Sequence, residues 1–338
     1  MTDRPTPHGG RTAQITVADQ KTLAALLGPA DSNLRYLEKR HPVVDFHLRG
    51  DVIKLTSESD DLHAVERLIK ELVALAEAGQ TIDPDLIRRT EGVLYSPGNT
   101  TPEEIFTHNI VSKRGRSIRP KTVGQKTYVD AIDSHTITFG IGPAGTGKTY
   151  LAMAKAVQAL QAKDVTRIIL TRPAVEAGEK LGFLPGTLTE KIDPYLRPLY
   201  DALHDMLDQS SIPKLMETGT IEVVPLAFMR GRTLNDAFII LDEAQNTTPE
   251  QMKMFLTRLG FGSKIVVTGD VTQVDLPGSQ TSGLRVVEKI LDGLDDVHFS
   301  RLNSQDVVRH QLVSEIVTAY EKWDATAEER NKPRRGRG

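Results

Sequence analysis

The sequence contains Gly142-Pro-Ala-Gly-Thr-Gly-Lys148-Thr149 directly after the β-branched run 135–141. This octapeptide matches the phosphate-binding loop pattern at every required position. The glycines let successive backbone N–H groups turn toward one point, Lys148 supplies a cation for the β- and γ-phosphates, and the Thr149 hydroxyl can ligate Mg²⁺. An alanine-rich helix is expected over 150–160, with its positive dipole end facing the anion. The sequence therefore predicts a site for ATP and Mg²⁺. Its phosphate-binding residues are Gly142, Pro143, Ala144, Gly145, Thr146, Gly147, Lys148 and Thr149.

The composition is that of a globular chain. With 338 residues, 39% of them hydrophobic and 26% charged, it can bury a sizeable core and hold more than one domain. The N-terminus lacks an apolar signal, and no uncharged stretch is long enough to span a membrane, so we expect a cytoplasmic protein without a membrane partner. The absence of cysteine excludes disulfides and thiolate metal sites. A net charge of -3 argues against a uniformly basic nucleic-acid binder.

Two basic segments, 113–121 and 330–338, lack a hydrophobic period. They are typical of an exposed linker and a disordered terminus, and simple solvation explains them as well as RNA binding does. Prolines and glycines recur throughout 79–124. This predicts a domain junction there, and the linker contains the first basic segment. The second segment lies within a predicted basic disordered tail, 323–338.

The pattern of apolar and polar residues over 13–78 predicts the order strand, helix, helix, strand, strand, helix. This is the order of a KH RNA-binding module. The turn Gly28-Pro-Ala-Asp31 lies where that module carries its GXXG backbone clamp, but Asp31 replaces the second glycine. A negative side chain near a passing phosphate leaves RNA binding and a structural or protein-docking role equally open.

Residues 125–322 contain further apolar runs of strand length, separated by helical segments. This alternation predicts a parallel sheet covered on both faces, and hence an α/β fold of the P-loop NTPase (RecA-like) class beside the small α+β N-terminal domain. The runs follow the phosphate loop at 166–171, 221–224, 237–242, 263–268 and 297–300.

Two acids end the run Phe238-Ile-Ile-Leu-Asp242-Glu243. At the carboxyl end of a buried strand, Asp242 is expected to hold Mg²⁺ through water, and Glu243 to polarise the attacking water. A helix N-cap would explain Asp242 but not Glu243 and Gln245 together.

Three further polar residues are expected around the nucleotide. Thr268 and Gln273 lie at or after the carboxyl end of another strand, where either is a candidate sensor of the γ-phosphate. Gln125 lies upstream of the first core strand, at a spacing compatible with recognition of the adenine edge.

At this point the chain resembles the PhoH-like ATPase family over about residues 105–322. The motifs that carry the resemblance are Gly142 to Thr149, Arg172 to Gly186, Phe228 to Leu234 running into Asp242 to Asn246, Thr268 to Asp270, and Asp306 to His310. The family is similar to the first core domain of superfamily 1 helicases. Its bacterial members with a KH-like domain are associated with RNA metabolism and with an endoribonuclease of ribosome maturation. The resemblance implies ATP hydrolysis coupled to RNA.

About 220 residues after the linker suffice for one such core, whereas a monomeric helicase closes ATP between two. A neighbouring subunit must then supply the arginine for the γ-phosphate, which predicts a homo-oligomeric ring such as a hexamer. Arg309 is the first candidate and Arg301 the second, with a surface helix arginine as the alternative. We expect Arg172, Arg230 and Arg232 near loops at the carboxyl edge of the sheet, where RNA binding and salt bridging are equally open.

Two functions fit these features. One is an RNA-stimulated ATPase or helicase-like remodeller, and the other is a nucleotide-switched RNA-binding scaffold that docks an endoribonuclease and hydrolyses ATP slowly. A small-molecule P-loop kinase is disfavoured because Glu243 beside Asp242 serves water activation.

Overall fold

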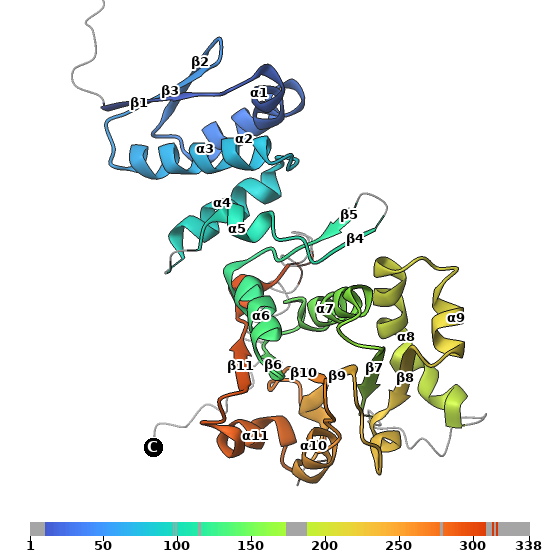
Figure 1. The fold of residues 1–338 in the computed structure, drawn as a ribbon. Coiled ribbons are helices and arrows are strands. Elements are labelled where there is room, and N and C mark those ends of the chain that lie inside the picture. Colours follow the sequence, from blue (N-terminus) through green and yellow to red (C-terminus); the bar gives the residue numbers. More distant parts are fainter. Residues whose placement is uncertain are drawn as a thin grey trace, which may run out of the picture.

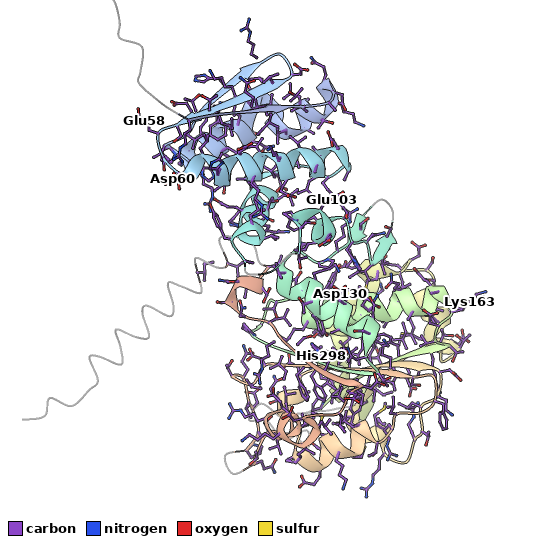
Figure 2. The ribbon with its side chains drawn as sticks, turned by 60° about the vertical axis from the view of Figure 1, so that its left-hand side comes forward. Glu58, Asp60, Glu103, Asp130, Lys163 and His298 are labelled. Carbon is purple, nitrogen blue, oxygen red and sulfur yellow. The ribbon has the colours of Figure 1, made fainter. Side chains whose placement is uncertain are left out.

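The structure is a computed structural model that describes residues 11–96, 98, 100–113, 116–173, 188–277, 280–308, 313 and 316. An N-terminal unit and a larger α/β core follow each other along the chain (Figure 1). Figure 2 shows Glu58 and Asp60 at the end of the molecule formed by the N-terminal unit, and Lys163 and His298 on the core. The predicted tail 323–338 lies outside the described residues.

The N-terminal unit contains the predicted elements in the predicted order. Its three strands form an antiparallel sheet in the order β1-β3-β2. All six apolar residues expected on one face of α3 are buried: Leu62, Val65, Leu68, Ile69, Leu72 and Val73. The elements are β1 (Arg11–Thr16), α1 (Gln20–Leu27), α2 (Ser32–Arg40), β2 (Asp45–Arg49), β3 (Val52–Ser57) and α3 (Asp61–Glu77).

The turn between α1 and α2 has an unusual backbone. Gly28, Ala30 and Asp31 have φ values of 72°, 49° and 58°. A Cβ on Gly28 would lie 2.7 Å from the side-chain amide of Asn33, which donates to the carbonyl oxygens of Leu26 and Ile82. Position 28 therefore requires glycine, for both conformation and space.

Residues 79–124 differ from the predicted linker. They contain the helices α4 (Pro84–Tyr95) and α5 (Pro102–Phe106) and the hairpin β4 (Val111–Lys113) and β5 (Arg116–Ile118). Ile87, Ile105 and Phe106 are buried in the same hydrophobic cluster as α3. Two of the prolines that suggested a linker, Pro84 and Pro102, occupy first helical positions, where the missing N–H costs nothing, after the capping side chains of Asp83 and Thr101.

The described part of the first basic segment makes structural contacts. The Lys113 ammonium donates to the backbone carbonyls of His204, in the last turn of α8, and Leu207, directly after α8. The Arg119 guanidinium donates to the Gln80 side chain and the Phe106 carbonyl. These cations hold neighbouring elements together.

The core contains six parallel strands in the order β11-β6-β10-β9-β7-β8. This sheet confirms the predicted α/β fold class. The strands are β6 (Ile137–Ile141), β7 (Arg167–Arg172), β8 (Ile221–Pro225), β9 (Ala237–Leu241), β10 (Lys264–Gly269) and β11 (Val297–Arg301). The helices are α6 (Val123–Ser134), α7 (Lys148–Ala162), α8 (Leu188–Met206), α9 (Ile212–Glu217), α10 (Pro249–Leu256) and α11 (Gly283–Leu291).

Helices cover both faces of the sheet, with α6, α7 and α8 on one side and α10 and α11 on the other (Figure 1). Alternate residues of each strand enter opposite clusters. In β9, Phe238 and Ile240 pack with the first group of helices, whereas Ile239 and Leu241 pack with the second. A strand buried on both faces has no polar alternation, which explains its continuous apolar run.

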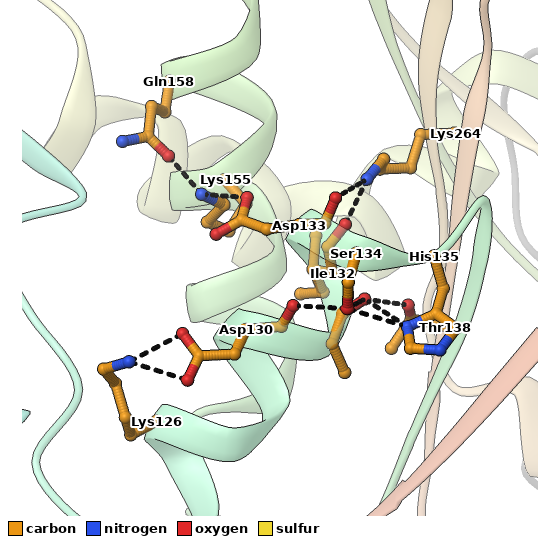
Figure 3. A network of polar contacts seen from close by, with 11 residues as sticks. Lys126, Asp130, Ile132, Asp133, Ser134, His135, Thr138, Lys155, Gln158 and Lys264 are labelled. Carbon is orange, nitrogen blue, oxygen red and sulfur yellow. Dashed lines mark hydrogen bonds and ion pairs between the residues drawn. The ribbon is translucent and has the colours of Figure 1, made fainter.

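Polar contacts fix α6 against the sheet and α7 (Figure 3). Lys155 of α7 forms an ion pair with Asp133 at 2.5 Å, and Lys264 of β10 donates to the Asp133 carbonyl at 2.9 Å. Thr138 of β6 donates to the Ala131 carbonyl at 3.2 Å. These bonds at the C-terminal end of α6 set the position of its N-terminal end, which faces the phosphate loop.

Candidate nucleotide-binding site

The loop 142–147 joins β6 to α7, as the sequence predicted. Gly145 and Gly147 have φ values of 83° and 76°, which glycine adopts without strain. A Cβ on Gly142 would lie 2.4 Å from the carbonyl oxygen of Leu302, and the Gly142 N–H donates to Gly269 at 3.2 Å. The ends of β10 and β11 therefore hold the loop from both sides.

Lys148 begins α7 and is 8% exposed. Its ammonium donates to the carbonyl oxygens of Gly142 at 2.7 Å and Pro143 at 2.8 Å, so the cation lies over the loop. Behind it, the phenol of Tyr128 donates to the Lys148 carbonyl at 3.3 Å. Burial, with the charge of Asp242, raises the pKa of Tyr128 well above its usual range, so the phenol stays protonated as a donor.

Three oxygen-bearing side chains meet beneath the loop. The Thr149 hydroxyl donates to Asp242 Oδ1 at 2.7 Å, and the Thr268 hydroxyl donates to the same oxygen at 2.8 Å. The two hydroxyl oxygens are 3.2 Å apart. A carboxylate and hydroxyls are the hard oxygen ligands that Mg²⁺ prefers, and Mg²⁺ commonly binds through one or two carboxylates and the phosphates. The donor set thus fits a Mg²⁺ ion accompanying a nucleotide.

Glu243 follows Asp242 in a left-handed conformation, with φ of 52° and ψ of 40°. Such a conformation is uncommon outside glycine, and it is found at functional sites. One carboxylate oxygen of Glu243 accepts a bond of 2.9 Å from Arg172, and the other accepts a bond from the side-chain amide of Gln245. Both oxygens are therefore engaged within the chain.

The amide of Gln245 extends this network to β10. Gln245 is 1% exposed, and its carbonyl oxygen accepts the backbone N–H of Asp270 at 3.0 Å. The path from Arg172 through Glu243 and Gln245 to Asp270 joins the carboxyl ends of β7, β9 and β10. The sequence suggested Gln245 by its place after the two acids, but nothing in the sequence assigned it this contact.

The structure places Gln125 next to the loop with its side chain already bonded. Its amide nitrogen donates to the Thr146 carbonyl at 3.0 Å, and its amide oxygen accepts from the backbone of Lys121 at 2.7 Å. Thr268 is fully buried against Asp242, whereas Gln273 is exposed on the turn after Asp270. Recognition of adenine by Gln125 and γ-phosphate sensing by Thr268 or Gln273 stay predictions.

The arginines fall into different environments. Arg172 bonds Glu243, and Arg232 forms a bidentate pair with Glu222 at 2.7 and 2.6 Å. Arg230 is exposed, and Arg301 at the end of β11 is exposed and paired with Glu288. Arg309, the first candidate for action in a neighbouring site, lies outside the described residues.

Comparison with known proteins identifies the family. The PhoH-like protein family matches residues 117–321, more than half of the chain and the whole parallel sheet. The chain belongs to the PhoH-like protein family. This confirms the resemblance that the motifs indicated.

Close relatives of the PhoH-like chain extend across its N-terminal unit. A PhoH-like protein of Mycobacterium tuberculosis (strain ATCC 25618 / H37Rv) is 66% identical over 89% of this chain and 86% of its own length. A PhoH-like protein of Bacillus subtilis is 52% identical over 88% of this chain and 93% of its own length. Protein PhoH of Escherichia coli K12 is 46% identical over 60% of this chain and 58% of its own length.

Among solved structures, the chain matches a Sulfolobus solfataricus SWI2/SNF2 ATPase core in complex with dsDNA. The match has a TM-score of 0.29 and 18% identity, and covers 43% of this chain and 31% of the other. Within the described residues, no helix of the PhoH-like chain has the length and apolar content needed to cross a membrane.

Proposed function

We propose that this PhoH-like protein is a Mg²⁺-dependent ATPase whose turnover is coupled to RNA binding or remodelling. One observation carries the hydrolytic part of the proposal. The hydroxyls of Thr149 and Thr268 both lie within hydrogen-bond distance of Asp242, directly beneath the loop that Lys148 covers. Side chains separated by more than a hundred residues thus meet at one phosphate-binding loop.

The roles follow from this geometry. Lys148 and the loop amides would hold the β- and γ-phosphates, and Thr149 and Asp242 would hold the Mg²⁺ ion that neutralises phosphate charge. Glu243 accepts a proton from the attacking water once one of its oxygens is released from Arg172 or Gln245.

RNA is the proposed partner. The support is the resemblance to a family associated with RNA metabolism, the basic segment 330–338, and the KH-like order of elements in the N-terminal unit. In such a module the exposed turn 28–31 would face the RNA backbone. The same turn carries Asp31, so the N-terminal unit is equally suited to docking a protein.

A nucleotide-switched scaffold that docks an endoribonuclease is the second candidate. It is favoured by the engagement of both Glu243 oxygens by Arg172 and Gln245. A carboxylate held in this way has less capacity to accept a proton from water, which fits slow turnover in the absence of a partner.

A shared site between subunits completes the proposal. The described residues form one nucleotide-binding core, so a homo-oligomeric ring in the cytoplasm is proposed to bring an arginine of one subunit to the γ-phosphate of the next. Arg309 is the first candidate for this arginine and Arg301 the second.

Steady-state ATPase rates with and without single-stranded RNA test the proposal. Glu243→Gln should retain ATP and lose turnover by about 10²-fold or more, whereas Lys148→Ala should weaken ATP binding. Glu217→Gln, on the exposed surface of α9, is the matched control. Near-normal turnover by Glu243→Gln would overturn the water-activating role. RNA binding that depends on ATP, without RNA stimulation of hydrolysis, would select the scaffold.

A further inference from the structure

A cleft of about 710 Å³ lies between α4 and the core. Three segments line it: residues of α4 between 85 and 96, residues 121–124 at the start of α6, and residues between 301 and 308 after β11. Its volume is that of a typical small-molecule site.

The cleft walls are bonded to the phosphate loop. The Val308 N–H donates to the Gly145 carbonyl at 3.0 Å. The Thr122 hydroxyl donates to Asp306 Oδ1 at 2.6 Å, which joins two of the lining segments. Three residues further along α6, Gln125 donates to the loop carbonyl of Thr146. The segments that line the cleft are therefore hydrogen-bonded directly to the phosphate loop, at Gly145 and Thr146.

The strand order determines which part of a nucleotide would face the cleft. Asp242, Glu243 and Thr268 come from β9 and β10, on one side of β6, whereas β11 lies on the other side. A triphosphate with its γ-phosphate toward Glu243 must extend its α-phosphate and nucleoside away from β10. That direction leads toward β11 and the cleft.

Side chains from α4 suit such an occupant. Arg88 and Tyr95 are exposed on the cleft side of the helix, and Arg89 and Lys121 lie nearby. Burial lowers the pKa of Lys121, and the charge of Arg89 adds to the effect. Asp85, which also lines the cleft, forms ion pairs with Arg88 and Arg89. The aromatic ring of Tyr95 offers a stacking surface to a base.

We propose that α4 forms the outer wall of the nucleoside subsite, so that a helix of the segment 79–124 contributes directly to binding a nucleoside 5′-triphosphate. The inference rests on the proposed ATPase function and adds α4 to the residues that would contact the nucleotide. A nucleoside is favoured over an RNA strand because the lining segments are hydrogen-bonded to the phosphate loop itself.

Gly92 provides the test. It lies in the last turn of α4, lines the cleft, and a Cβ added to it would meet no atom within 4 Å. Alanine at this position therefore meets no clash and raises helix propensity, and larger side chains at this exposed position extend toward the cleft.

The experiment measures the Kd of ATP and of inorganic tripolyphosphate, in Mg²⁺, for wild type, Gly92→Ala, Gly92→Leu and Gly92→Trp. The Kd of ATP should rise with side-chain size, about tenfold or more for Gly92→Trp, because the nucleoside loses its space. The Kd of tripolyphosphate, which has no nucleoside, should stay constant across the series. Glu217→Trp, on the exposed surface of α9 and outside the cleft, is the control of equal side-chain size and should bind ATP as wild type does.

An unchanged ATP affinity in Gly92→Trp would overturn the inference and leave the proposed function intact. Equal loss of ATP and tripolyphosphate would also overturn it, since the effect would then concern the phosphate loop. Loss of RNA affinity with unchanged ATP affinity would assign the cleft to RNA instead. A wild-type protein that binds neither ATP nor tripolyphosphate would overturn the proposed function itself.

Discussion

The guanidinium of Arg172 lies 2.9 Å from Glu243 Oε1 and 3.9 Å from Asp242 Oδ2. One cation at the end of β7 thus faces both acids at the end of β9. Arg172 was expected at this edge of the sheet, with RNA phosphate and salt bridging as equal alternatives, and the structure shows the salt bridge.

We predict that Arg172→Gln raises ATP turnover in the absence of RNA by several-fold. Removal of the guanidinium frees one oxygen of Glu243 to accept a proton from water. The ratio of the ATPase rate with RNA to the rate without RNA should fall correspondingly, because the rate without RNA is already raised. Steady-state rates with and without single-stranded RNA measure both effects.

Arg232→Gln is the control for this variant, since Arg232 also carries an ion pair, but to Glu222. Its basal rate should match wild type. A lower basal rate in Arg172→Gln would contradict the prediction and make Arg172 a positioning residue for Glu243.

A second prediction concerns the metal site. Thr268→Val removes the hydroxyl that donates to Asp242 and keeps the shape of the side chain. The Mg²⁺ concentration for half-maximal ATP hydrolysis should rise about tenfold, the lower end of the effect of partners that orient a metal ligand. Thr171→Val is the matched control, because the buried Thr171 hydroxyl has no hydrogen-bond partner among the described residues. Equal Mg²⁺ dependence in both variants would contradict this role of Thr268.

A third prediction concerns stability. A Cβ on Gly140 would lie 2.8 Å from the ring of Tyr128, which is fully buried beneath β6. Gly140→Ala should therefore lower the free energy of unfolding by about 1–3 kcal/mol, the usual effect of overpacking a core. Urea unfolding measures it, with Gly92→Ala as the control that should gain up to about 1 kcal/mol. A Gly140→Ala protein as stable as wild type would contradict the contact.

The basic segment 330–338 contains five Lys and Arg residues, and its removal provides a fourth prediction. For a single strand, the slope of log affinity against log salt is about -0.7 for each phosphate neutralised. Deletion of 330–338 should therefore make this slope shallower by up to about 3.5. The double variant Glu328→Gln, Glu329→Gln, which removes no cation, should not make it shallower. An unchanged slope after deletion would exclude the segment from RNA binding.

The fifth prediction tests the shared site. Lys148→Ala and Arg309→Ala subunits, each inactive alone, should recover activity when mixed, because about a quarter of the interfaces in a randomly mixed ring pair an intact loop with an intact arginine. A mixture of Lys148→Ala with Glu243→Gln should not recover, since both residues act on the same side of the interface. No recovery in the first mixture, together with a monomeric mass in solution, would contradict the ring.

The parallel sheet was predictable because β9 is a continuous apolar run and the centres of β7 and β10 are apolar too. The phosphate loop was predictable because its chemistry requires glycine, lysine and threonine at fixed spacing. The pair Asp242 and Glu243 could be placed near the loop because carboxyl ends of parallel strands meet at one edge of a sheet.

Other contacts had no local signal. Arg172 and Glu243 are 71 residues apart, and Gln125 bonds Thr146 across a strand, so only the folded chain reveals these pairs. The segment 79–124 was predicted to be a linker because proline usually interrupts helices and strands. Pro84 and Pro102 instead begin helices, and the capping residues Asp83 and Thr101 before them were the available signal.

The pairing of β6 with β11 has a consequence during protein synthesis. These neighbouring strands are joined at Thr136 and Asp296, which are 160 residues apart in the chain. At about 5–20 residues per second, a ribosome needs roughly 8–32 seconds between making one and making the other. Until then, the contacts of Leu302 and Val308 with the glycine loop do not exist. A nascent chain therefore completes this site only after β11 and Val308 have been synthesised, and a product that terminates before them lacks it.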